Sequence, residues 1–129
     1  MVFNIKEGFM QVVITGKNID VGDSLKSYID EHFSQKIGKK YSDFVLTSAI
    51  TLSKESHKHE ELYKIDIIIT AKPKVGGEVL KGSSTGDTAY KAFDNAIVKV
   101  ESQLHKHKNK VTSHHHKHSN KESSSFISR

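Results

Sequence analysis

Residues 85–110 read TGDTAYKAFDNAIVKVESQLHKHKNK and carry the longest helical pattern in the chain. Apolar side chains recur along it at steps of three and four residues, the spacing that places them on one face of a helix. They are Ala89, Phe93, Ala96, Ile97, Val100 and Leu104. A rotation of about 100° per residue places a second stripe on the opposite face, consisting of Lys91, Asn95, Lys99, Ser102, Lys106 and Lys110. We therefore expect one face to pack on a sheet and the other to present an unpaired row of lysines.

The composition indicates a single domain. A chain of 129 residues is long enough for one modest core, and a hydrophobic fraction of 35% indicates that part of it is disordered. The chain has no cysteine, which excludes disulfides and thiolate chemistry and suits a reducing compartment. No apolar run approaches the roughly 18 residues of a membrane span, and the N-terminus lacks the apolar core of a signal peptide. We therefore expect a cytoplasmic protein with no membrane contact.

The net charge of +5 is concentrated at the C-terminal end. Residues 1–104 contain fourteen lysines and fourteen acidic residues, which cancel. Residues 105–129 contain five lysines and one arginine against Glu122 alone, together with six of the nine histidines. A basic segment after a charge-balanced domain favours a polyanionic partner, most commonly nucleic acid. A tail that only improves solubility is the alternative.

The rest of the chain predicts four strands and one further helix. Alternating apolar residues bounded by turn residues predict strands over residues 10–15, 44–53, 62–71 and 78–84. In the second strand, Phe44 and Leu46 are expected on the same buried face as Ile50 and Leu52. The first helix is expected over residues 22–37, with Gly38 as the glycine that commonly follows a helix end. A polar hairpin loop is expected over residues 54–61.

The resulting order is β-α-β-β-β-α, an α+β fold. A first β-α-β unit favours a right-handed crossover between parallel strands, and hairpins join the next three strands. We predict a four-stranded mixed sheet with two amphipathic helices packed on one face. Residues 1–9 are expected to form an N-terminal extension, with either Met1 or Met10 as the true start. Residues 10–111 are expected to form the domain, and residues 112–129 a disordered tail rich in His, Lys and Ser.

Catalytic and metal-binding patterns are weak. The histidine groups, His57 with His59 and the run His114, His115, His116 and His118, match no defined ligand spacing. No nucleophile elbow, glycine-rich phosphate loop or pair of carboxylates at a strand end is found. We therefore expect no enzyme, no cofactor, no metal site and no small-molecule substrate. Asp87 with Thr88 before the apolar stripe is typical of a helix cap.

Three stretches resemble the ribosome hibernation-promoting factor family, whose short members include protein Y, the ribosome-associated inhibitor. They are MQVVITGKNIDVGDSLKSYI at 10–29, ITLSKE at 50–55 and GDTAYKAFDNAIVKVESQLHKHKNKV at 86–111. The most specific pattern joins the Lys-His-Lys segment at 106–108 to Gly86, Asp87, Tyr90, Ala92, Phe93 and Asp94. The resemblance spans residues 10–111.

This resemblance implies a non-enzymatic ribosome binder with a fold similar to a double-stranded RNA-binding domain. Members of the family wedge into the small ribosomal subunit and contact 16S rRNA with basic helix faces. They occupy the mRNA channel and the A- and P-site tRNA positions, which inhibits translation in stationary phase or under stress. The implied rRNA contacts here are Lys26, Lys91, Lys99, Lys106, Lys108 and Lys110. The motif residues Asp87, Tyr90, Phe93 and Asp94 are expected to be structural, with Tyr90 partly in the core.

Some features depart from the family. Long members carry a second, C-terminal domain that pairs ribosomes into inactive dimers, and no such domain follows Val111, so pairing would need a separate dimerising factor. Glu101 and Val98 stand where other members carry charge. Two other functions stay open: a general module for structured RNA, and a metal-storing protein that uses the histidine tail.

Overall fold

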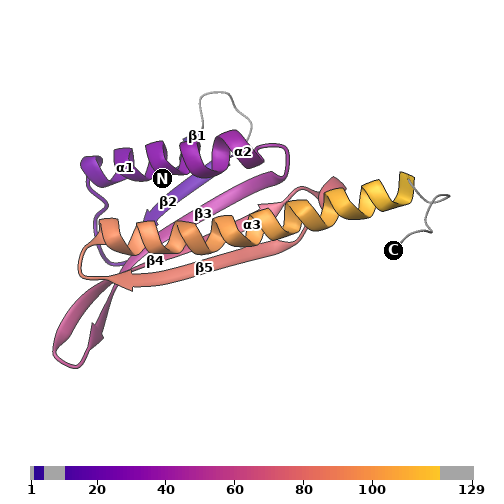
Figure 1. Ribbon diagram of the computed structural model, residues 1–129. Helices are drawn as coiled ribbons and strands as arrows, with labels where there is room; N and C mark the ends of the chain where they lie inside the picture. The colour runs from indigo at the N-terminus through magenta and orange to yellow at the C-terminus, as the bar shows by residue number, and fades with distance from the viewer. Residues whose placement is uncertain (1, 5–10, 120–129) are drawn as a thin grey trace.

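The computed structural model describes residues 2–4 and 11–119, which form one mixed sheet with helices on one face (Figure 1). The strands are β1 (Val2–Asn4), β2 (Gln11–Gly16), β3 (Val45–His57), β4 (Glu60–Ala71) and β5 (Val79–Gly86), and they lie in this order across the sheet. β2 and β3 are parallel, and the other neighbours are antiparallel. The predicted four-stranded mixed sheet is confirmed. β1, which falls in the predicted extension, adds a short fifth strand at its edge.

Two helical segments cover the sheet. The first comprises α1 (Asp23–Phe33), the π-helical turn η1 (Ser34–Gly38) and α2 (Lys39–Tyr41), and the second is α3 (Ala89–Ser119). A short 3₁₀ turn, η2 (Pro73–Val75), joins β4 to β5. The packing of two helices on one face is confirmed (Figure 1). Residues 112–119, expected in the disordered tail, continue α3 as helix, and the rest of that tail lies outside the described residues.

The first helix does not end at Gly38, so the predicted end was wrong. Gly38 has right-handed helical dihedrals, with φ −58° and ψ −46°. The buried residues of this segment recur at every fourth position: Leu25, Ile29, Phe33, Ile37 and Tyr41. A repeat of four drifts about 40° per step around a helix of 3.6 residues per turn, and the wider π turn reverses that drift. Burial of the Tyr41 ring thus stabilises helix beyond the glycine.

A β-bulge reverses the facing of residues at the start of β3. The register with β4 shifts between Val45 and Thr47, and Val45 is fully buried while Leu46 is 45% exposed. The prediction that Leu46 shares a buried face with Ile50 was therefore wrong, because a bulge places two residues opposite one. Ile50 and Leu52 are buried, as predicted.

The hairpin between β3 and β4 is longer than the sequence indicates. Both strands continue through the predicted loop to a two-residue turn, Lys58–His59, whose φ values are 49° and 72°. Two positive φ values are the mark of a type I′ turn, which matches the strand twist. The hairpin projects from one end of the molecule, and the C-terminal end of α3 projects from the other (Figure 1).

Two glycines allow α3 to approach β5 closely. A Cβ atom on Gly82 would lie 2.9 Å from the Ala96 carbonyl oxygen, and one on Gly86 would lie 2.9 Å from the Ala92 nitrogen. Both distances are shorter than a carbon atom tolerates, so only glycine fits without a shift. The close crossing buries Phe93 and Leu104 completely and fixes which flank of α3 faces α1 and which faces β5.

Candidate nucleic-acid interface

One flank of α3 lies along the edge of the sheet and carries Lys99, Lys106 and Lys110. The Lys99 Nζ donates a 2.8 Å hydrogen bond to the Ser83 carbonyl oxygen, and the Gln103 side-chain amide donates to the Lys81 carbonyl oxygen. Both carbonyls belong to β5, the last strand of the described sheet. Side chains of α3 therefore satisfy backbone acceptors on an edge that another strand could otherwise pair with.

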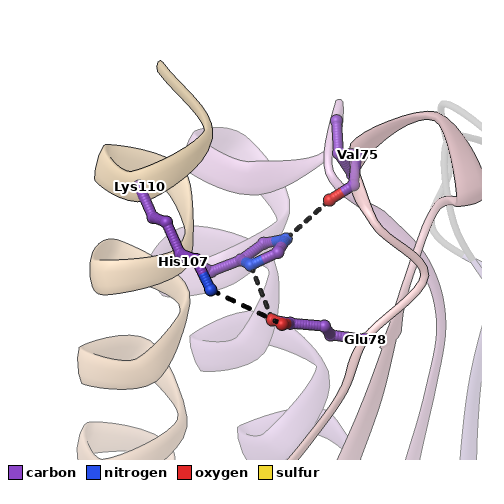
Figure 2. Close-up of polar contacts among 4 residues, drawn as sticks. All are labelled: Val75, Glu78, His107 and Lys110. Atoms are coloured by element: carbon purple, nitrogen blue, oxygen red, sulfur yellow. Dashed lines mark hydrogen bonds and ion pairs between the residues drawn. The ribbon is translucent and has the colours of Figure 1, made fainter. Parts of the chain in front are cut away.

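At the C-terminal end of the same flank, His107 joins α3 to the turn between β4 and β5 (Figure 2). Its side chain is 5% exposed, its Nδ1 lies 2.8 Å from the Glu78 Oε1, and its Nε2 lies 2.9 Å from the Val75 carbonyl oxygen. Lys110 adds a longer contact, 4.0 Å from its Nζ to the Glu78 Oε2. Only the contact of Nε2 with Val75 has hydrogen-bond geometry, and the contact of Nδ1 with Glu78 is a close approach without it.

The predicted lysine row is not unpaired, and this part of the prediction was wrong. Lys91 lies 3.3 Å from Asp87, one turn before it, while Lys99 and Lys110 have the partners described above. The acidic partners, Asp87 in the turn before α3 and Glu78 beside β5, lie outside the stripe. A helical projection of α3 therefore does not show them. Lys106 is exposed, and no ion pair involves it within the described part of the chain.

The opposite flank of α3 packs against α1. The Tyr28 hydroxyl donates hydrogen bonds to both carboxylate oxygens of Asp94, at 2.8 and 3.0 Å. This hydrogen bond, followed by burial and the charge of Asp94, raises the pKa of Tyr28 to about 12. Tyr90 is 39% exposed and its ring stands edge-on to that of Tyr28, with centroids 4.8 Å apart. The centroid of the His32 ring lies 4.0 Å from that of Tyr28.

Farther along this flank, α2 and α3 border an open hollow of about 590 Å³. Its lining residues, which define the α2–α3 hollow, are Lys40, Tyr41, Val98, Glu101, Ser102, His105 and Lys108. Lys108, one of the predicted rRNA contacts, lies here and not with the other lysines of α3. Lys40 is not among the predicted contacts, because its position beside Glu101 depends on the unpredicted continuation of the helix past Gly38.

The six predicted rRNA-contacting lysines therefore lie on separate surfaces. Lys99, Lys106 and Lys110 follow the β5 flank, Lys108 lies in the α2–α3 hollow, and Lys91 is at the start of α3. Lys26 is half-buried on α1, and no ion pair of its side chain is found among the described residues. Among the motif residues, Phe93 is buried and Asp87 is exposed beside Lys91. The neighbouring Thr88 hydroxyl accepts a hydrogen bond from the Lys91 backbone.

The described side chains include no group of three or more His, Cys, Asp or Glu placed to hold a metal ion. His59 is exposed at the β3–β4 turn, while the side chains of His57 and of the histidine run at 114–118 lie outside the described part. In the same described portion, no helix is both long and apolar enough to cross a membrane.

The fold and the lysines on α3 define an α+β domain suited to a polyanionic partner. Residues 12–112 match the model of the family described as Sigma 54 modulation protein / S30EA ribosomal protein, and the chain belongs to this family. The predicted resemblance to ribosome hibernation factors is thereby confirmed.

Relatives of this chain are named as ribosome hibernation factors. A ribosome hibernation promoting factor of Escherichia coli K12 is 29% identical over 102 residues, which cover 79% of this chain and 97% of the relative. A ribosome hibernation promotion factor of Mycobacterium tuberculosis is 26% identical over 102 residues, covering 78% of this chain. The match spans only 44% of that relative, and 50% of a further one from Rhizobium meliloti.

Two solved structures share the fold. A ribosomal subunit interface protein from Coxiella burnetii superposes with a TM-score of 0.62 at 21% identity, over 75% of this chain and 96% of the other. The N-terminal domain of Thermus thermophilus Protein Y gives 0.52 at 20% identity, over 79% and 96%. The likeness to both structures supports the α+β fold of this chain.

Proposed function

We propose that this protein is a ribosome hibernation factor. In this proposal it binds the small ribosomal subunit through 16S rRNA, occupies the mRNA channel and the A and P tRNA sites, and inhibits translation in stationary phase or under stress. The main support is that relatives matching over 102 residues are named as ribosome hibernation factors. The exposed lysines of α3 support it, because lysines that neutralise backbone phosphates are the main source of affinity for RNA.

The proposed action is stoichiometric and needs no catalysis. A protein that blocks tRNA and mRNA sites acts by occupancy, so it needs no substrate, cofactor or metal. Its place of action would be the cytoplasm, where ribosomes work. If ribosomes are paired into dimers, we expect a separate dimerising factor to take part.

Sedimentation with ribosomes tests the proposal directly. The purified protein is centrifuged through sucrose gradients with small subunits, large subunits and whole ribosomes, at low and moderate salt. Co-migration with small subunits and whole ribosomes, weakening as salt rises, is the expected result. Protein that stays at the top of the gradient at low salt would contradict the proposal. Equal affinity for a plain RNA duplex would instead favour a general module for structured RNA.

A further inference from the structure

The α2–α3 hollow brings together polar groups that suit a phosphate. Lys40 comes from α2, while Ser102, His105 and Lys108 come from successive turns of α3. Two ammonium groups, a hydroxyl and an imidazole can all donate to phosphate oxygens. Tyr41, only 4% exposed, borders the hollow at the end of α2, and burial is the main reason that its pKa is raised. The hollow thus carries two lysines against one glutamate and is bounded by packed structure.

The two lysines of the hollow are held differently. The Lys108 Nζ lies over the rings of Tyr41 and Phe44, 5.7 and 6.0 Å from their centroids. An aromatic face attracts a cation without cancelling its charge, and no carboxylate pairs with Lys108 among the described side chains. The Lys40 Nζ, by contrast, lies 3.3 Å from the Glu101 Oε2. One positive charge of the hollow is therefore available, and the other is occupied by a carboxylate of the same chain.

The Lys40–Glu101 pair is exchangeable. The side chain of Lys40 is 61% exposed and that of Glu101 26% exposed, and ion pairs with such access to water are weak and screened by salt. A phosphate that approaches Lys108 meets Lys40 within the same hollow and offers it a stronger acceptor than water. Glu101 must then give up Lys40 and turn toward solvent.

We propose that the α2–α3 hollow binds a backbone phosphate of RNA and that Glu101 competes with this phosphate for Lys40. This inference rests on the proposed function, since the phosphate belongs to the RNA of the ribosome. The competition weakens binding to isolated or sparse phosphates. Densely folded RNA, where several phosphates contact the protein together, overcomes it. Glu101 thus lowers the affinity for polyanions that place few phosphates against the protein.

The variant Glu101→Gln tests the competition, and Glu61→Gln is its matched control. Glu61 pairs with Lys54 at 3.7 Å on the β3–β4 hairpin, which projects away from the C-terminal half of α3 (Figure 1). Both substitutions remove one negative charge from a lysine–glutamate ion pair. Affinity for purified small ribosomal subunits is measured across a series of salt concentrations, and circular dichroism confirms that each variant is folded.

Glu101→Gln is expected to bind several-fold more tightly, whereas Glu61→Gln matches the unmodified protein. The plot of log affinity against log salt should also steepen, because no carboxylate then offsets the charge of Lys40. Adding Lys40→Gln to Glu101→Gln should reverse both effects. Lys108→Gln alone should weaken binding and flatten the slope. Equal effects of Glu101→Gln and Glu61→Gln would overturn the proposal, because net charge alone would then account for the gain.

The failure of this inference is distinguishable from failure of the proposed function. If the unmodified protein binds small subunits and the hollow variants do not differ from it, the function stands and the hollow is excluded. If the unmodified protein binds no ribosomal particle, the function fails, and the hollow is tested with inorganic phosphate by nuclear magnetic resonance. Shifts of the Ser102 and His105 signals that disappear in Lys108→Gln would support the site, and their absence would exclude it.

Discussion

The Tyr28 hydroxyl on α1 donates a 2.8 Å hydrogen bond to the Asp94 carboxylate on α3, which ties the two helices together across the face of the sheet. Tyr90 and Phe93 pack edge-on against the same Tyr28 ring. The contact sets the spacing of the helices and therefore the position of the α2–α3 hollow farther along. Two residues of the family-like motif, Tyr90 and Asp94, thus help to join α1 to α3 beside the candidate interface.

Removing the Asp94 carboxylate should lower the pKa of Tyr28 toward its ordinary value. The folded-state pKa of Tyr28 is raised from 10.0 to about 12, so the folded state keeps a proton that the unfolded chain loses. The resulting stability is fully present below pH 10 and is lost as the pH rises from 10 to about 12. Asp94→Asn should lower this pKa, measured by tyrosinate absorbance, and reduce stability at neutral pH by about 1 kcal/mol.

Tyr28→Phe provides the control for that experiment. It removes the hydroxyl while keeping the ring packed against Tyr90, so Asp94→Asn should have little additional effect in this background. An unchanged titration of Tyr28 in the single Asp94→Asn variant would show that the carboxylate is not the cause of the shift.

Two neighbouring histidines on α3 should differ sharply in their contribution to stability. His107 is buried and its Nε2 lies 2.9 Å from the Val75 carbonyl oxygen, whereas His105 is exposed. His107→Ala leaves the Val75 carbonyl without its hydrogen-bond partner and opens a space, so we expect a loss of about 2 kcal/mol in urea unfolding. His105→Ala should change stability by less than about 0.5 kcal/mol. Equal losses would show that helix propensity, and not the contact with the turn, decides the effect.

The sequence predicts the parts of this fold that depend on local periodicity. The apolar stripe of α3 and the buried Ile65, Ile67 and Ile69 of β4 follow from spacing alone. The end of the first helix does not, because burial of Tyr41 outweighs the usual preference for ending at Gly38. The bulge after Val45 also depends on pairing with β4, which no local pattern records.

The candidate interface was predicted in residue type but not in arrangement. The lysines of α3 are visible in the sequence, while their partners are not. Glu78 is far from Lys110 in the chain, and the Ser83 carbonyl that binds Lys99 is a backbone group. The α2–α3 hollow requires Lys40 and Lys108 to converge from separate elements. Contacts between elements therefore place the predicted lysines on separate surfaces.

Lys99 and Gln103 should protect the edge of β5 against self-association. Their side chains donate hydrogen bonds to the Ser83 and Lys81 carbonyls. Without them, the N–H groups of a strand from another molecule could pair with these carbonyls at the sheet edge. The double variant Lys99→Met with Gln103→Met leaves these acceptors open, so we expect concentration-dependent oligomers in analytical ultracentrifugation. Lys91→Met makes the same charge change on the same helix and should remain monomeric. Oligomers of equal size in both variants would assign the effect to lost charge.

The individual lysines of α3 should contribute unequally to ribosome binding. The charge of Lys91 is already partly balanced by Asp87 at 3.3 Å, while Lys106 is exposed and has no ion pair in the described region. Lys106→Gln should therefore flatten the salt dependence of small-subunit binding by roughly 0.7–0.9, the value for one phosphate contact, and Lys91→Gln by clearly less. The triple variant Lys91→Glu, Lys99→Glu and Lys106→Glu should release the protein from ribosomes at moderate salt. Undiminished co-sedimentation of this variant would remove the β5 flank from the interface and leave the α2–α3 hollow as the remaining basic surface of α3.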